Sequence, residues 1–299
     1  MKTFEQAIAK ENFVITAEIS SPISCGPKEL EDKIDILKGT VHAINITDNP
    51  GATAHMSSLV GSAIVIEKGI DPILQITCRD RNRLAIQSDL MGASALGINN
   101  VLTLGGDPIK NGDQPDAKAV FDLNSKTLLT IMKNMNETGE TMSGRMLSTK
   151  GSFFPGSAAI VHDPTKEWDP KILNRKAELG TKFIQTQFCY DIDILKNYMK
   201  HIVDAGLTDK LAFIIGIGPF KTGKTAQWMK EKLFGTIIPD AMIRRMDQAN
   251  DKLEEGIIIC AELIDQLQDI DGVSGAHLMA PRNLSGIAAS VKRAGITIS

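Results

Sequence analysis

A short apolar run followed by a segment with helical spacing recurs eight times along this chain of 299 residues, and no other feature constrains the fold as strongly. The runs are rich in β-branched residues, which predicts strands, and several of the helical segments end near a glycine. Parallel strands need crossover helices, and eight such units close a sheet without a free edge. We therefore expect one domain, a (β/α)8 TIM barrel over residues 1–299, with an open doubly wound sheet as the alternative.

The order of the predicted elements is regular except near the end of the chain. The strands are predicted at residues 14–20, 41–47, 73–78, 99–106, 152–161, 182–189, 211–217 and 275–280. The helices that follow them are predicted at 27–37, 52–68, 82–96, 123–135, 169–179, 192–205, 226–233 and 284–293. Two extra helices, at 240–249 and 252–269, are predicted as an insertion before the eighth strand, and the polar segment 136–150 is predicted to be a loop.

Composition excludes several classes of function. A hydrophobic fraction of 42%, a charged fraction of 23% and a net charge of −3 give no excess of basic residues for a nucleic acid or a membrane surface. No apolar run approaches the ~20 residues needed to span a bilayer, so we expect a cytoplasmic protein. The four cysteines are far apart and form no C-x-x-C pair, so no metal site is predicted.

Polar residues follow nearly every predicted strand, which is where a barrel of this class carries its functional side chains. Each has an ordinary structural explanation, such as a helix cap or a turn, but their joint placement indicates a site. Glu18 is the most informative, because it follows the apolar run Val14–Ala17 and burial is expected to raise its pKa toward the range of a general acid. The set comprises Glu18, Thr47, Asp48, Gln75, Thr77, Cys78, Asp107, His162, Gln187 and Gly218.

The fourth predicted strand ends in an unusual loop. Val101–Leu104 lacks polar alternation, which is typical of a strand covered on both faces. Gly105 and Gly106 would let the backbone approach a ligand closely, and they place Asp107 at the carboxyl end of the strand. An ordinary turn, with Asp107 as the turn former, is the alternative.

A formal P-loop, G-x-x-x-x-G-K-T, spans Gly218–Thr225. In a P-loop, backbone amides hold phosphates, Lys224 would contact the terminal phosphates and Thr225 would bind magnesium. The motif follows the seventh strand, and no apolar strand ending in Asp follows it to hold the metal. A P-loop nucleotide-binding protein is therefore the rival hypothesis; within a barrel, Lys221 or Lys224 could instead contact a phosphorylated ligand.

Several motifs together resemble the methylenetetrahydrofolate reductase family, and the match runs in order from Val14 to about Gly295. The segments Cys78–Arg83 and Gly112–Pro115 resemble the branch found in acetogens and in fusions with methyltransferases. The motifs that carry the family resemblance are Ala17–Pro22, Gln75–Arg83, Leu104–Pro108, Asp169 and Lys176 ahead of Thr186–Phe188, and Ile238–Pro239.

The resemblance implies a barrel that reduces 5,10-methylenetetrahydrofolate to 5-methyltetrahydrofolate, in the one-carbon metabolism of methionine biosynthesis or acetogenesis. It implies that Glu18 is the general acid that helps open the methylene bridge, that reduced flavin delivers the hydride, and that Asp107 favours the cationic intermediate. Gln187 and Gln75 would bind the folate. The residues expected to contact the flavin, usually FAD, are Thr47, Thr77, Gly105, Gly106, His162, Asp169 and Lys176.

Two departures concern the cofactor. Many family members have Arg where this chain has Gly105 and His where it has Gln75, and both residues contact the flavin in those members. FMN, or hydride transfer without a flavin, is therefore kept beside FAD. The electron donor is expected to be NAD(P)H or a partner subunit, and we expect an oligomer. A pterin-binding barrel that transfers a methyl group to a corrinoid protein is a second alternative.

Overall fold

The computed structural model describes residues 3–11, 13–164, 168–280 and 282–298. Eight parallel strands form a closed barrel in sequence order, and β8 pairs with β1 to complete it. The predicted (β/α)8 barrel is confirmed, and the open sheet is excluded. The strands are β1 (Val14–Ile19), β2 (Ala43–Ile46), β3 (Asp71–Thr77), β4 (Asn100–Leu104), β5 (Phe154–Ala159), β6 (Phe183–Phe188), β7 (Ala212–Ile217) and β8 (Val273–Leu278).

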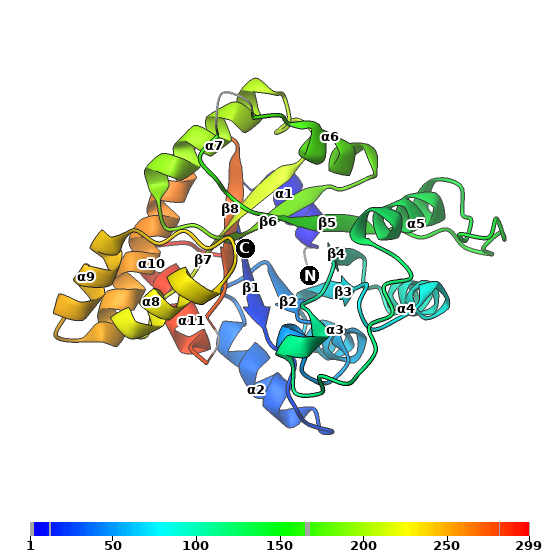
Figure 1. Ribbon diagram of the computed structural model, residues 1–299, viewed down its shortest axis with the longest axis horizontal. Coiled ribbons are helices and arrows are strands. Elements are labelled where there is room, and N and C mark those ends of the chain that lie inside the picture. The colour runs from blue at the N-terminus through cyan, green and yellow to red at the C-terminus, as the bar shows by residue number, and fades with distance from the viewer. Residues whose placement is uncertain (1–2, 12, 165–167, 281, 299) are drawn as a thin grey trace.

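Helices surround the barrel, as Figure 1 shows. Every residue of β2 and β3 is buried, because side chains fill the barrel on one face and helices cover the other. Helices, most of them amphipathic, surround the strands. They are α2 (Lys28–Leu37), α3 (Ser58–Glu67), α4 (Arg83–Ala95), α5 (Ser125–Glu137), α6 (Lys171–Glu178), α7 (Ile192–Asp204), α8 (Gly223–Lys232), α9 (Asp240–Gln248), α10 (Lys252–Gln268) and α11 (Leu284–Arg293).

The two extra helices before β8 are present as predicted, and the second replaces α8 as the cover of the last strands. α10 packs on β7 and β8, whereas α8 packs on α9. One boundary prediction was wrong: the helix expected from residue 52 begins at Ser58, because Asn49, Gly51 and Ala52 all have positive φ angles that an α-helix does not allow. No helix within the described ranges is long and apolar enough to cross a membrane.

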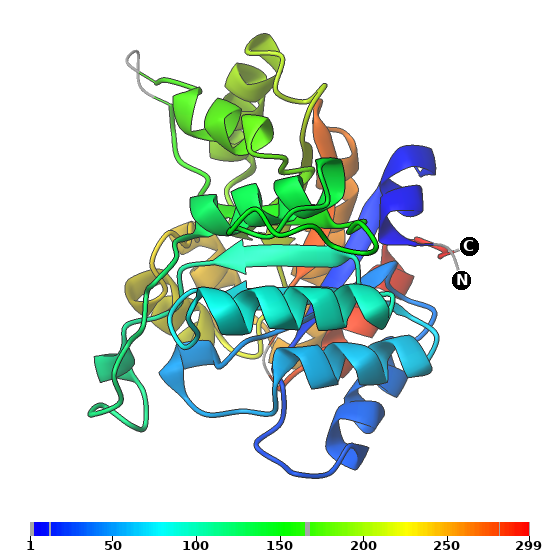
Figure 2. The same cartoon turned by 90° about the vertical axis from the view of Figure 1, so that its right-hand side faces the viewer.

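A short N-terminal helix that was not predicted closes the base of the barrel. α1 (Phe4–Lys10) lies at the end from which the strands start, drawn in dark blue in Figure 2. The Phe4 ring packs edge-on against Phe183, with ring centroids 5.2 Å apart, and Phe183 stacks on Phe154. The Phe4 backbone N–H also donates to Asp71 Oδ2 over 2.6 Å. Seven residues are too few to reveal helical periodicity, which explains the omission.

We expect Phe4→Leu to lower the free energy of unfolding by about 1–2 kcal/mol, since Leu keeps most of the buried volume but loses the aromatic edge contacts. Chemical denaturation measures this change. Phe234→Leu is the matched control, because Phe234 is 87% exposed and its replacement should change stability by less than about 0.5 kcal/mol. Equal effects of the two variants would contradict the role given to the Phe4 ring.

Candidate functional site

A cavity of about 610 Å³ opens among the carboxyl ends of the strands. Its wall is mainly apolar, with polar groups converging from several elements, as is usual in sites for small organic ligands. Six of the residues predicted from the sequence line it: Glu18, Gln75, His162, Asp169, Lys176 and Gln187. Other lining residues are Leu102, Leu104, Ala158, Ala159, Ile160, Trp168, Ile172, Leu173, Gln185, Thr186, Tyr198, Phe234, His277 and Met279.

Glu18 lies near the end of β1 with its side chain 24% exposed. Gln75 Nε2 donates to its Oε2 over 2.7 Å, and His277 Nε2 lies 3.9 Å from the same oxygen. Burial raises the pKa of Glu18, but the adjacent His277 and the hydrogen bond from Gln75 together outweigh it, so the pKa lies below its usual value. The predicted rise in this pKa was wrong, because the groups that stabilise the carboxylate come from β3 and β8.

His277 is the residue that sequence reasoning missed. It is the last residue but one of β8, is 3% exposed, and reaches the cavity between Glu18 and a buried polar layer. Its Nδ1 lies 2.9 Å from Thr16 Oγ1 and 3.2 Å from Gln185 Nε2. The sequence offered one signal: His277 and Met279 are two positions apart in a strand, so they share the inward face.

Lys176 provides a cation on the α6 side of the cavity. Its Nζ donates to the Ala158 carbonyl over 2.5 Å, and in the described part of the chain it forms no ion pair with a carboxylate. Burial, together with the charge of Lys126, lowers the pKa of Lys176. The nearby Asp169 is exposed and pairs with Lys171 instead, at 2.6 Å.

His162 is the third predicted cofactor contact on this side. It is exposed at the edge of the cavity, and its ring packs edge-on against Tyr198 with centroids 5.2 Å apart. Gln187, the predicted folate contact, is half-buried at the end of β6, and its Oε1 accepts from the Phe188 N–H. The cavity therefore joins predicted substrate contacts and predicted cofactor contacts in one space.

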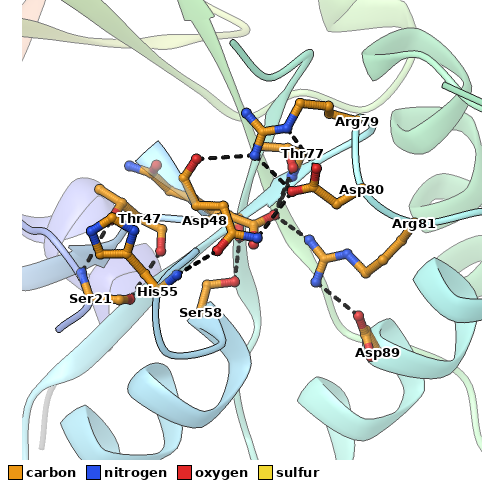
Figure 3. Close-up of polar contacts among 12 residues, drawn as sticks. Ser21, Thr47, Asp48, His55, Ser58, Thr77, Arg79, Asp80, Arg81 and Asp89 are labelled. Atoms are coloured by element: carbon orange, nitrogen blue, oxygen red, sulfur yellow. Dashed lines mark hydrogen bonds and ion pairs between the residues drawn. The ribbon is translucent and has the colours of Figure 1, made fainter. Parts of the chain in front are cut away.

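On the opposite side of the barrel mouth, polar side chains form hydrogen bonds with one another and with the backbone of the same chain (Figure 3). Thr47 Oγ1 accepts from the Ser21 N–H, and both the N–H and the hydroxyl of Thr77 donate to Asp48 Oδ2. Asp48 also pairs with Arg81. Thr47 and Thr77, both predicted to contact the cofactor, are thus buried in this network and do not line the cavity.

Arg79 is the centre of that network. Its side chain is 1% exposed and forms two hydrogen bonds to Asp80, at 2.6 and 2.7 Å. It also donates to the backbone carbonyls of Asn49, at 3.0 Å, and Asp107, at 3.2 Å. Burial raises the pKa of Asp80, but the bonds from Arg79 and Asn49 outweigh it and hold that pKa below its usual value. One buried cation therefore joins the loops after β2, β3 and β4.

The Gly-Gly-Asp segment after β4 belongs to the same network. The Asp107 carboxylate is exposed and accepts from the Gly51 N–H over 2.9 Å, so it does not meet Glu18 in the cavity. Gly106 has φ +98°, and a Cβ at this position would lie 2.8 Å from Arg79 Cβ. Gly105, where many family members have arginine, is exposed, and a Cβ at this position would have no neighbour within 4 Å. Gly106 thus makes room for Arg79.

The P-loop-like segment is packed by its own chain. Phe220 is buried and stacks on Tyr190, with ring centroids 4.3 Å apart. Thr222 Oγ1 accepts from the Thr225 N–H and caps α8, while a Cβ on Gly223 would lie 2.0 Å from Asp247 Oδ1. A side-chain cap and an adjacent carboxylate disfavour a phosphate at this helix start, which argues against the P-loop hypothesis. In the described ranges no group of three His, Cys, Asp or Glu could hold a metal ion.

A profile of the methylenetetrahydrofolate reductase family matches residues 3–295. Methylenetetrahydrofolate reductase 1 of Schizosaccharomyces pombe is 23% identical over 96% of this chain and 47% of its own length. Methylenetetrahydrofolate reductase 2 of Saccharomyces cerevisiae is 25% identical over 85% of this chain and 42% of its own length. The chain thus spans about half the length of these relatives.

A solved structure from Clostridium thermocellum has the same fold. It superimposes with a TM-score of 0.67 and 17% sequence identity, covering 97% of both chains. It is described as an uncharacterised protein that binds two copies of 5-methyl-5,6,7,8-tetrahydrofolic acid. With the profile match over nearly the whole sequence, these findings establish that the chain belongs to the methylenetetrahydrofolate reductase family.

Proposed function

We infer that this protein reduces 5,10-methylenetetrahydrofolate to 5-methyltetrahydrofolate in the cavity at the barrel mouth. The observation that carries this proposal is a carboxylate, Glu18, held by Gln75 at the wall of a largely apolar cavity that also contains Gln187. Membership of the reductase family supports the reaction, and the folate bound by the Clostridium thermocellum protein supports the class of ligand.

The β5–α6 side of the cavity fits a flavin. Apolar residues such as Ala159 and Leu173 suit a planar ring, and Lys176 supplies a partly buried cation without a carboxylate partner among the described residues. We assign Lys176, His162 and Asp169 to the flavin and its phosphate, whether FAD or FMN. A bound flavin supplies the hydride for the reaction.

Glu18 is assigned the proton transfer. Its lowered pKa means that the free protein holds it as a carboxylate at neutral pH. A folate that fills the cavity removes water from this group, and such desolvation favours its protonated form. Once the proton has moved to the substrate amine, the carboxylate remains beside the cationic carbon and stabilises it. Asp107 is proposed for the same stabilisation, which requires its side chain to leave the Gly51 N–H.

The reaction is tested by anaerobic incubation of purified protein with 5,10-methylenetetrahydrofolate and, separately, NADH, NADPH or reduced methyl viologen. We expect 5-methyltetrahydrofolate with at least one donor; a viologen-only reaction would indicate a partner subunit that supplies electrons. The absorption spectrum of the purified protein, with extraction of the cofactor, distinguishes FAD, FMN and no flavin. Methylation of a corrinoid protein without any reduction of folate would instead favour the methyltransferase alternative.

We expect Lys176→Met to weaken flavin binding roughly 10- to 100-fold, because a charge-assisted hydrogen bond contributes about 1.5–3 kcal/mol. Quenching of flavin fluorescence during titration of the apoprotein measures the dissociation constant. Lys171→Met is the matched control on the same helix, since Lys171 is 87% exposed and pairs with Asp169. Equal weakening by both variants would contradict a direct contact between Lys176 and the phosphate.

A further inference from the structure

His277 lies between Glu18 and a buried polar layer inside the barrel. Asn45, on β2, and Gln185, on β6, form a reciprocal amide pair: Asn45 Nδ2 donates to Gln185 Oε1 over 2.7 Å, and Gln185 Nε2 donates to Asn45 Oδ1 over 3.0 Å. Thr16 Oγ1 lies 3.1 Å from the same Gln185 nitrogen. All four side chains of this layer, Thr16, Asn45, Gln185 and His277, are at most 3% exposed.

The orientation of this amide pair assigns a role to His277 Nδ1. An amide nitrogen only donates, and one hydrogen of Gln185 Nε2 is used by Asn45. If its second hydrogen goes to Thr16, the Thr16 hydroxyl keeps its own hydrogen, which it can donate to Nδ1 at 2.9 Å. If it goes to Nδ1, at 3.2 Å, the ring nitrogen accepts it directly. We take Nδ1 as the acceptor in both arrangements; a ring with its hydrogen on Nδ1 would instead donate to the Thr16 hydroxyl, which has two lone pairs.

An imidazole that accepts at Nδ1 carries its hydrogen on Nε2. Nε2 is the atom that faces Glu18, 3.9 Å from Oε2. A small rotation of the carboxylate would bring this separation into hydrogen-bond range. Gln75 Nε2 donates to the same oxygen from the other side, at 2.7 Å.

We propose that His277 is a positioning residue for Glu18: the layer of Thr16, Asn45 and Gln185 holds the ring as the Nε2–H tautomer, which directs a donor at the carboxylate. His277 and Gln75 then hold Glu18 at the cavity wall from two sides. The tautomer follows from the amide orientation taken for this layer and is tested directly below; the consequence for catalysis rests on the proposed function of Glu18.

The other ionisable groups around Glu18 do not duplicate this contact. A second cavity, of about 560 Å³, also reaches Glu18 and contains Glu29, Lys33, His55 and Arg282. The first cavity contains His162, Asp169 and Lys176 besides His277. Among the described residues, the hydrogen bond from Gln75 and the 3.9 Å approach of His277 Nε2 are the interactions that the Glu18 carboxylate makes.

Two substitutions test the roles of the two ring nitrogens of His277 one at a time. Asn places an amide group near the former Nδ1, so His277→Asn can still accept from Thr16 but offers no hydrogen to Glu18. Gln reaches the former Nε2, so His277→Gln keeps a donor toward Glu18 and loses the acceptor. If His277 only accepts a hydrogen bond in the polar layer, His277→Asn should stay closer to the wild type in Glu18 pKa and kcat than His277→Gln does. The proposal predicts the reverse order.

The direct readout is the pKa of Glu18, followed by NMR of protein labelled with ¹³C at the glutamate carboxyl and assigned with Glu18→Gln. We expect His277→Asn to raise this pKa by about one unit, because the carboxylate loses a stabilising donor, and His277→Gln to raise it less. His201→Asn is the control, since His201 lies on α7 and lines neither cavity that reaches Glu18. An unchanged pKa in His277→Asn, or a ¹⁵N spectrum showing Nδ1–H in the wild type, would overturn the proposal.

Turnover gives the second readout. We expect His277→Asn to lower kcat of folate reduction 10- to 100-fold with little change in KM, and His277→Gln to restore part of kcat. The NMR titration needs no activity, so it tests the positioning role even if the wild type does not reduce folate. Wild-type turnover with no effect of His277→Asn on the Glu18 pKa would reject the inference and leave the proposed function standing.

Discussion

Glu18→Gln is expected to lower the reduction of methylenetetrahydrofolate by about 10²–10⁴-fold, the range typical of a positioned general acid. Gln has nearly the same shape as Glu but cannot release a proton to the substrate, and it has no charge to stabilise the cationic carbon. Reduction of the bound flavin by the electron donor should be largely unchanged, because no proton from Glu18 is needed there. Stopped-flow absorbance measures the two half-reactions separately.

Glu29→Gln is the matched control for Glu18→Gln. Glu29 lines the second cavity together with Glu18 but pairs with Lys33 at 2.8 Å, so its charge has no assigned role in the reaction. We expect folate turnover of this variant to equal that of the wild type. If Glu18→Gln slowed both half-reactions equally, its role as the acid of the folate step would be wrong.

Arg79→Ala is expected to lower the free energy of unfolding by about 3–5 kcal/mol, the cost of removing one partner from a buried ion pair. The variant leaves Asp80, which is 25% exposed, without its two strongest bonds, and it frees the carbonyls of Asn49 and Asp107. Urea denaturation measures the loss. Faster hydrogen exchange in the loops after β2 and β4 would accompany it.

Arg83→Ala removes a similar ion pair at a solvent-exposed position and is the matched control. Arg83 also forms two side-chain bonds to one carboxylate, that of Asp122, but its side chain is 48% exposed, and its loss should cost no more than about 1 kcal/mol. Similar costs for the two variants would refute the importance of burial.

Low pH should also remove the contribution of the Arg79–Asp80 pair to the free energy of unfolding. The folded-state pKa of Asp80 lies below its ordinary value of 3.8, so the stabilisation is complete above that pH and is lost as the pH falls further. Wild-type stability should therefore decline below about pH 3.8 more steeply than that of Arg79→Ala.

The barrel could be predicted because its strands are buried on both faces and most of its helices are amphipathic, so nearly every unit has a local pattern. α1 could not, because seven residues carry too little periodicity and its position depends on Phe154 and Phe183, far along the chain. The start of α3 was misplaced because positive φ angles at Asn49 and Ala52 leave no clear pattern in the residues themselves.

The candidate site was predictable to the extent that it follows the carboxyl ends of strands, which placed Glu18, Gln75 and Gln187 in one cavity. Reading only the ends of predicted strands also explains why His277 was missed. It is the last residue but one of β8, which ends at Leu278, but the eighth strand was predicted to continue to residue 280. The pKa of Glu18 could not be judged from its apolar neighbours in sequence, because its polar partners are brought in by the closure of the barrel.

Family resemblance cannot reveal whether a polar side chain contacts the ligand or another residue of the protein. Thr77 matches a segment expected to contact the cofactor, yet its hydroxyl donates to Asp48. That partnership depends on the register of β2 and β3, in which Asn45 pairs with Ile73 and the strands end close together. Whether Thr47 and Thr77 also contact a flavin stays a prediction.

The amide pair inside the barrel restricts how this sequence can evolve. Replacing Asn45 or Gln185 alone by an apolar residue leaves its partner buried with unmade hydrogen bonds, which costs more than replacing both together. The Thr16 hydroxyl and the His277 ring depend on the same amide. These four positions, drawn from β1, β2, β6 and β8, should therefore change in concert among descendants of this chain, and a lineage that loses one of them should soon lose the rest.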